Sequence, residues 1–150
     1  PYTVAYQTQM LEVNPHEKIL EVGTGSTYQA CVLAAMGAQV YTIERQRNIF
    51  DQNKSFYYPR KYPSIRYFYG DGYDGLPTFA PFDKIIVTAA APEIPQKLLD
   101  QLKPGGKMII PVGDGKVQQM IRINKYPDGS LLEESFDDFS FVPMLQGKNN

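Results

Sequence analysis

A run of ten residues decides how this chain folds: Ile19-Leu-Glu-Val-Gly-Thr-Gly-Ser-Thr-Tyr28. The apolar residues within Lys18–Val22 predict a buried strand, and the apolar pattern of Tyr28–Met36 predicts a helix. Between them, Gly23 and Gly25 permit a sharp turn and a close approach of a ligand to the backbone. A helix that begins at such a turn directs unpaired N–H groups at whatever lies over the loop. The stretch therefore indicates a nucleotide-like ligand at the carboxyl edge of a parallel sheet.

The composition is that of one globular domain without a strong net charge. The chain has 150 residues, 43% of them hydrophobic, and 15 Lys and Arg against 16 Asp and Glu give a net charge of −1. A nucleic-acid binder would show a basic excess, so we expect no nucleic-acid partner. Because Cys31 is the single cysteine, no internal disulfide can form, which favours a reducing compartment and a cytoplasmic protein. No apolar run is long enough to cross a membrane and no secretory signal precedes the first motif, so no membrane partner is expected either.

Strand and helix patterns alternate through most of the chain. We expect strands at 18–22, 39–43, 65–69, 82–88 and 107–112, and helices at 1–13, 28–36, 48–57 and 95–102. The first helix should turn Gln7 and Gln9 outward, and residues 103–106 should form a turn. Beyond residue 112 the pattern changes, and two segments at 117–123 and 131–136 predict an antiparallel pair.

These patterns predict the α/β class and a single domain over residues 1–150. The sheet should be doubly wound and mostly parallel, Rossmann-like, with an antiparallel C-terminal edge. The single histidine, His16, lies in an expected turn, and we expect no metal site.

Four features fall at the carboxyl ends of successive predicted strands, where a doubly wound sheet binds its ligand. The first is the turn 23–27. The second is Glu44, which lies 21 positions after Gly23, near the spacing of about 20 expected for an acidic residue that binds ribose hydroxyls. The third is Gly70-Asp-Gly72, and the fourth is the loop 88–92. Together these four features favour a ligand site far more than any one of them alone.

The turn does not suit a nicotinamide dinucleotide. That fingerprint requires a small residue where Tyr28 stands. The spacing better fits the Glu-x-Gly-x-Gly-x-Gly turn of S-adenosylmethionine-dependent methyltransferases. The methionine end of that cofactor carries an amine and a carboxylate. Backbone N–H groups of the turn would serve the carboxylate, and the charge of Glu21 would favour the amine or sulfonium side.

The sequence resembles the protein-L-isoaspartate O-methyltransferase family, a family of protein repair enzymes. The matching stretches run in order along nearly the whole chain: Ile19–Ala30, Val40–Arg45, Tyr69–Tyr73, Ala80–Pro92, Leu99–Gly113 and Phe141–Leu145. The resemblance implies S-adenosyl-L-methionine as cofactor, with S-adenosyl-L-homocysteine as product. It also implies methyl transfer to the α-carboxylate of L-isoaspartyl residues in damaged proteins and peptides.

The resemblance assigns roles to fifteen positions. The cofactor would contact Glu21, Gly23, Thr24, Gly25, Ser26, Thr27, Glu44, Arg45, Asp71 and Gly72. In detail, 23–27 would hold the methionine part, Glu44 the ribose with Arg45 beside it, and Asp71 with Gly72 the adenine. The substrate would be bordered by Thr88, Ala89, Ala90, Val142 and Pro143.

Two departures from the family pattern keep other functions open. The family usually has glycine where Thr27 stands, which predicts a bulkier turn. The family's active-site serine would precede Pro1, so we name no catalytic residue within this sequence and suspect a fragment. The alternatives are a methyltransferase acting on RNA or a small molecule, and an inactive cofactor-binding domain. The loop 88–92 lacks the aromatic residue that many nucleic-acid amino-methyltransferases carry there.

Overall fold

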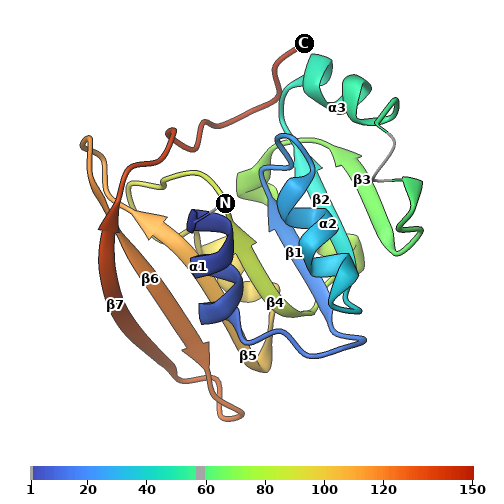
Figure 1. Ribbon diagram of the computed structural model, residues 1–150. Coiled ribbons are helices and arrows are strands. Elements are labelled where there is room, and N and C mark those ends of the chain that lie inside the picture. Colours follow the sequence, from blue (N-terminus) through green and yellow to red (C-terminus); the bar gives the residue numbers. More distant parts are fainter. Residues whose placement is uncertain (1, 57–59) are drawn as a thin grey trace.

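The computed structural model describes residues 2–56 and 60–150, which form an α/β domain around one sheet (Figure 1). Within these residues the sheet has seven strands in the order β3-β2-β1-β4-β5-β6-β7. The strands are β1 (Lys18–Val22), β2 (Gln39–Glu44), β3 (Ile65–Tyr69), β4 (Phe82–Val87), β5 (Leu102–Val112), β6 (Gln118–Lys125) and β7 (Leu131–Phe139). Strands β1 to β5 pair in parallel, and β6 and β7 are antiparallel. The predicted fold class and the antiparallel C-terminal edge are confirmed.

The sheet is covered on both faces. The α-helices are α1 (Tyr2–Leu11), α2 (Tyr28–Ala35), α3 (Arg47–Asn53) and α5 (Gln96–Asp100), with short 3₁₀ helices η1 (Gly72–Asp74) and η2 (Pro77–Phe79). Helices α1 and α2 lie side by side on one face (Figure 1). Successive residues of a strand point to opposite faces, so in β4 the side chain of Ile86 joins the core beneath α1 and α2 while Ile85 joins the opposite core. The continuous apolar centre of β4 is thus buried on both sides.

Helix α1 differs from its prediction in its buried face. Gln7 was expected to be exposed, but its side chain is only 2% exposed. Its Nε2 donates a hydrogen bond to the carbonyl oxygen of Val87 (3.1 Å), at the end of β4. The prediction was wrong because the hydrogen bond to a strand-end carbonyl 80 residues away offsets the cost of burying the Gln7 amide.

Several element boundaries also differ from the sequence prediction, among them those of β5, β7 and α5. Residues 103–106, expected as a turn, belong to β5, whose pairing with β4 shifts register between Phe82 and Lys84. A Cβ at Gly106 would lie 2.6 Å from the carbonyl oxygen of Asp83, so glycine here permits close strand contact rather than a separate turn. Helix α3 ends at Asn53, and the predicted helix end at Tyr57 lies outside the described residues, as does Pro1.

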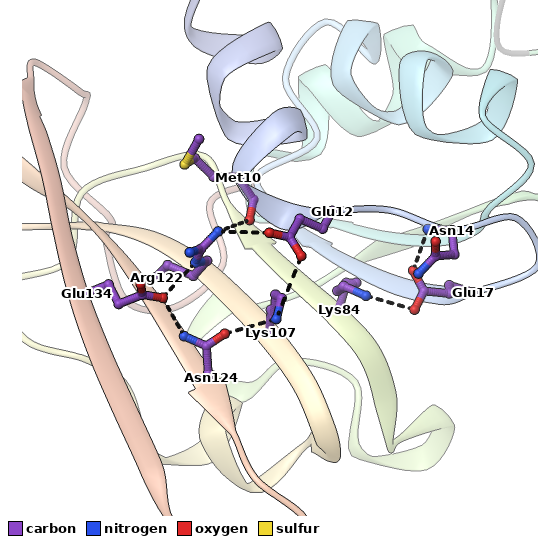
Figure 2. A network of polar contacts seen from close by, with 9 residues as sticks. All are labelled: Met10, Glu12, Asn14, Glu17, Lys84, Lys107, Arg122, Asn124 and Glu134. Carbon is purple, nitrogen blue, oxygen red and sulfur yellow. Dashed lines mark hydrogen bonds and ion pairs between the residues drawn. The ribbon is translucent and has the colours of Figure 1, made fainter.

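A polar network fixes the C-terminal end of α1 to the sheet (Figure 2). The guanidinium of Arg122 on β6 donates to the carbonyl oxygen of Met10 (3.1 Å) and to Glu12 (3.3 Å). Its Nε also donates to Glu134 on β7 (2.9 Å), which accepts from Asn124 as well (2.7 Å). The anchored helix therefore presents its first turn at the carboxyl edge of the sheet (Figure 1).

None of the helices formed by residues 2–56 and 60–150 is long and apolar enough to cross a membrane.

Candidate cofactor-binding site

The glycine turn after β1 approaches the loop after β4 very closely. Gly23 has φ +99°, and a Cβ added to it would lie 2.3 Å from the hydroxyl of Thr88. That hydroxyl lies 2.7 Å from the carbonyl oxygen of Gly23 and 3.0 Å from that of Val22, so it ties the two loops together. Gly25 has φ +53°, and a Cβ there would meet nothing within 4 Å. The turn is thus packed against Thr88 at Gly23, whereas the space next to Gly25 is open.

Two cavities meet at this turn and share Gly23, Gly25 and Thr88. The strand-end cavity, of about 390 Å³, is formed by the loops that follow β1, β2 and β4 and by a C-terminal segment. The helix-side cavity, of about 690 Å³, lies between the turn and the first turns of α1 and α2. The strand-end cavity is lined by Val22, Gly23, Gly25, Ile43, Glu44, Arg45, Gln46, Ile49, Gly72, Thr88, Ala89, Val142, Pro143, Met144 and Leu145. The helix-side cavity is lined by Thr3, Val4, Gln7, Glu21, Gly23, Thr24, Gly25, Ser26, Tyr28, Gln29, Thr88 and Phe141.

Glu44 at the end of β2 lines the strand-end cavity with both oxygens held by backbone groups. Oε1 accepts from the N–H of Gly25 (3.0 Å), and Oε2 accepts from the N–H of Gln46 (3.0 Å). The side chain is 6% exposed. Because each carboxylate oxygen has a second lone pair, the oriented group can still accept hydrogen bonds from two ligand hydroxyls.

Glu21 on β1 lines the helix-side cavity and is fully buried. Its Oε1 accepts from the hydroxyl of Thr42 (2.6 Å), which lies 2.6 Å from the hydroxyl of Thr24. Its Oε2 has no hydrogen-bond partner among the described residues. The pKa of Glu21 is raised to about 8: burial raises it most, the hydrogen bond from Thr42 lowers it, and the charge of Glu44 raises it. A cationic ligand group would stabilise the charged form.

The remaining predicted cofactor contacts divide among several places. Gly72 and Arg45 line the strand-end cavity, and the Nε of Arg45 donates to the carbonyl oxygen of Gly147 (3.1 Å). Asp71 does not line either of these two cavities. Its carboxylate caps η1 by accepting from the N–H of Tyr73 (2.9 Å). Asp71 therefore fixes the loop beside Gly72.

The predicted substrate contacts lie where a C-terminal segment runs beside the loop after β4, with Pro143 paired in parallel to Ala90. Figure 1 shows this segment passing over the carboxyl edge of the sheet. Ala90 donates its N–H to the carbonyl oxygen of Val142 (2.8 Å) and accepts from the N–H of Met144 (2.6 Å). Ala90 is 3% exposed and lies behind the cavity wall, whereas Ala89, Val142 and Pro143 line it. The side chain of Val142 is 72% exposed, so apolar surface is available at the cavity mouth.

Thr27 adopts the left-handed conformation that favours glycine. Its φ is +73°, and its side chain is 3% exposed. It lines a separate cavity of about 410 Å³ behind the turn, together with Cys31 and Tyr62. The bulk of Thr27 thus points away from the two cavities that meet at Gly25, and its cost is backbone strain.

Sequence reasoning missed the contribution of α1 and α2 to the site. Thr3, Val4 and Gln7 from α1 and Gln29 from α2 all line the helix-side cavity. Nothing in the sequence links them to the glycine turn, because helical glutamines and threonines are usually at the surface. Among residues 2–56 and 60–150 no three His, Cys, Asp or Glu side chains lie close enough together to hold a metal ion.

Comparison with known proteins gives a consistent assignment. The sequence profile of the family described as protein-L-isoaspartate(D-aspartate) O-methyltransferase matches residues 1–149. This chain belongs to that family. Protein-L-isoaspartate O-methyltransferase of Christiangramia forsetii is 50% identical over 149 residues, which are 99% of this chain and 70% of that protein. The protein of the same name from Cytophaga hutchinsonii is 48% identical, over 97% of this chain and 65% of its own length. The resemblance inferred from the motifs is confirmed, and the chain is a member of a methyltransferase family.

Solved structures show the same fold. A protein-L-isoaspartate O-methyltransferase structure superposes with a TM-score of 0.87 at 27% identity, covering 95% of this chain and 46% of that one. A Plasmodium falciparum chain assigned to the same family, in complex with S-adenosyl-L-homocysteine, gives a TM-score of 0.83 at 22% identity, covering 97% of this chain and 74% of that one. This chain spans about two thirds of the length of the curated relatives that it matches.

Proposed function

We propose that this chain is the cofactor-binding domain of a protein repair methyltransferase. It transfers a methyl group from S-adenosyl-L-methionine to the α-carboxylate of L-isoaspartyl residues in damaged proteins and peptides, in the cytoplasm. The observation that carries the proposal is the pair of cavities joined at Gly23 and Gly25, with a carboxylate from Glu44 in one and from Glu21 in the other.

The residues present fit this cofactor. The open space in front of Gly25 lets a ligand lie against the backbone. Glu44 is oriented to accept from ribose hydroxyls, with Gly72 and Ile49 forming apolar walls for the adenine in the same cavity. The unpaired Oε2 of Glu21 suits the ammonium of the methionine part. Asp71 acts on the adenine through the loop that it caps.

The reaction depends mainly on how the protein positions the substrate carboxylate relative to the methyl group of the cofactor. When bound, S-adenosyl-L-methionine supplies an electrophilic methyl group on a positively charged sulfur. A carboxylate substrate is already ionised at pH 7 and needs no general base, which fits a site without a histidine. The chain must hold the attacking oxygen in line with the methyl group, about 3 Å away, and exclude water.

The substrate side of the site is small and apolar. Thr88 holds the turn in place through Gly23, while Ala89 leaves room for a peptide backbone. Val142 and Pro143 offer apolar contact at the mouth of the strand-end cavity. These residues border the substrate and do not react.

The proposal is tested by measuring transfer of radiolabelled methyl groups from S-adenosyl-L-methionine to an isoaspartyl peptide. The matched control is the same peptide with ordinary aspartate. The chain is assayed beside a longer protein that carries the preceding segment. Transfer to the isoaspartyl peptide alone, by either protein, supports the proposal. Cofactor binding without transfer by either protein would indicate an inactive binding domain, and transfer to RNA or small molecules instead would indicate the alternative enzyme class.

A further inference from the structure

Gln29, at the start of α2, lines the helix-side cavity and carries a second unpaired oxygen, Oε1. Its side chain is 5% exposed and lines the cavity together with Glu21. Within the described part of the chain, neither Oε1 of Gln29 nor Oε2 of Glu21 has a hydrogen-bond partner. A buried acceptor without a donor is costly, so two of them beside one cavity point to a ligand that donates to both.

Hydrogen bonds from α1 fix the orientation of the Gln29 amide. The hydroxyl of Thr8 donates its proton to the carbonyl oxygen of Val4 (2.7 Å). It can therefore only accept from Gln29, whose Nε2 lies 2.8 Å away. Because the nitrogen end of the amide is held by Thr8, Oε1 is the end left without a partner.

The direction of the hydrogen bonds around Glu21 can be assigned in the same way. The hydroxyl of Thr42 donates its hydrogen bond to Oε1 of Glu21, so the hydroxyl of Thr24 must donate to that of Thr42. In the charged form of Glu21, which an ammonium ligand favours, this chain of hydroxyls leaves Oε2 as the free acceptor. Helix α2 and strand β1 thus supply two acceptor oxygens, one of them on an acid. No cation competes for them, since the cavity-lining residues include neither lysine nor arginine.

We propose that Gln29 binds the ammonium group of the cofactor's methionine part through Oε1, together with Glu21, and that Thr8 of α1 is the residue that positions it. This inference rests on the proposed function, because the ligand is the same cofactor. An ammonium group has three N–H donors and a positive charge, which matches two acceptors of which one is acidic. Helix α1 then belongs to the cofactor site, and the Arg122 network that anchors it has a functional consequence.

The test compares two ligands, S-adenosyl-L-homocysteine and an analogue in which hydrogen replaces its α-amino group. Binding is measured by calorimetry for the parent chain and for Gln29→Met, which keeps the length of the side chain but has no amide. We expect Gln29→Met to bind S-adenosyl-L-homocysteine about 10- to 30-fold more weakly. Its affinity for the deamino analogue should stay within about twofold of the parent value, because no ammonium is present to be lost.

A second variant tests the role of α1. Thr8→Val keeps the shape of the side chain but leaves the Gln29 amide free to turn, so we expect an intermediate loss, about 3- to 10-fold, again confined to the ligand with the amine. Thr78→Val is the matched control, since Thr78 is exposed in η2, lines neither cavity and should leave both affinities unchanged. Thermal unfolding of each variant reports its folding separately.

The outcomes separate this inference from the proposed function. If the parent binds S-adenosyl-L-homocysteine while Gln29→Met binds it equally well, the role of Gln29 is overturned and the proposed function stands. Equal losses for both ligands would also overturn it, because they would show that Gln29 acts only on the fold. A parent chain that binds neither ligand would overturn both proposals.

Discussion

The strand-end cavity and the helix-side cavity share a wall at Gly23 and Gly25 but are built in different ways. The first is formed largely by loops that directly follow β1, β2 and β4. The second is closed by α1, whose Gln7 contacts residues 80 and 113 positions away along the chain. One cavity thus follows from the parallel sheet itself, and the other depends on how a terminal helix packs against it.

The two cavities also differ in how their carboxylates are satisfied. Glu44 receives backbone N–H groups at both oxygens, whereas Glu21 has one hydroxyl partner and one unpaired oxygen. The strand-end cavity is therefore formed before a ligand arrives. The helix-side cavity retains an electrostatic cost that a cationic ligand would remove.

The largest expected effect comes from removing that cost with Glu21→Gln. The pKa of Glu21 is about 8 in the folded chain against 4.5 ordinarily, so the folded state holds the proton more tightly. Protonated Glu21 therefore contributes to the free energy of unfolding. This contribution is fully present below pH 4.5 and is lost as the pH rises through 8. The variant has no such loss. We expect its free energy of unfolding to match that of the parent near pH 5 and to exceed it at pH 8, by at most about 5 kcal/mol.

Urea denaturation at pH 5, 6.5 and 8 measures this difference. Saturating S-adenosyl-L-homocysteine should reduce the pH dependence of the parent, because the ligand's ammonium favours the charged form of Glu21. A stability difference that stays constant across the three pH values would show that the buried carboxylate costs nothing, and the contrast between the two cavities would disappear.

The shared wall should respond differently at its two glycines. In Gly23→Ala the new Cβ meets the Thr88 hydroxyl at 2.3 Å and φ is +99°, so we expect a loss of about 3 kcal/mol in the free energy of unfolding. In Gly25→Ala the Cβ enters open space at φ +53°, so the loss should be about 1 kcal/mol. Denaturation of both variants and calorimetry with S-adenosyl-L-homocysteine give the two readouts.

The expected pattern is a reversal between stability and affinity. Gly25→Ala should fold but bind the ligand at least about tenfold more weakly, because its Cβ occupies space that both cavities share. Equal stability losses in the two variants would contradict the close contact between the loops at Gly23. Unchanged affinity in Gly25→Ala would show that the ligand does not lie against Gly25.

Most of the sheet could be predicted because its signals are local. The apolar run of β4 and the glycine turn after β1 each identify their element from neighbouring residues alone. The sequence prediction failed where distant contacts decide the outcome. Gly106 was predicted to be part of a turn, although it allows β5 to pass close to Asp83 on the neighbouring strand β4.

The same reason explains which parts of the candidate site were found. Glu44 was identified by its spacing from Gly23, since strand and crossover lengths fix that spacing. Gln29 and Thr8 were missed, because the bond that pairs them forms only when α1 and α2 pack side by side. Spacing also could not show that the carboxylate of Asp71 caps η1 while its neighbour Gly72 lines the cavity.

The strand-end cavity is tested most directly by Glu44→Ala, compared with Glu44→Gln. The alanine variant removes the carboxylate proposed to accept from the ribose hydroxyls and releases the N–H groups of Gly25 and Gln46. We expect S-adenosyl-L-homocysteine to bind it about 30-fold more weakly, or about 2 kcal/mol, and Glu44→Gln to lose less because one carbonyl oxygen remains.

An analogue of the ligand without its 2′-hydroxyl separates ribose recognition from loop support. If Glu44 accepts from the ribose, the analogue should bind the parent more weakly but show a smaller loss on going to Glu44→Ala, since part of the interaction is already absent. Equal losses for the two ligands would mean that Glu44 only holds Gly25 in place. Parent-like binding by Glu44→Ala would refute the ribose assignment, and the strand-end cavity would then lack its main polar contact to the cofactor.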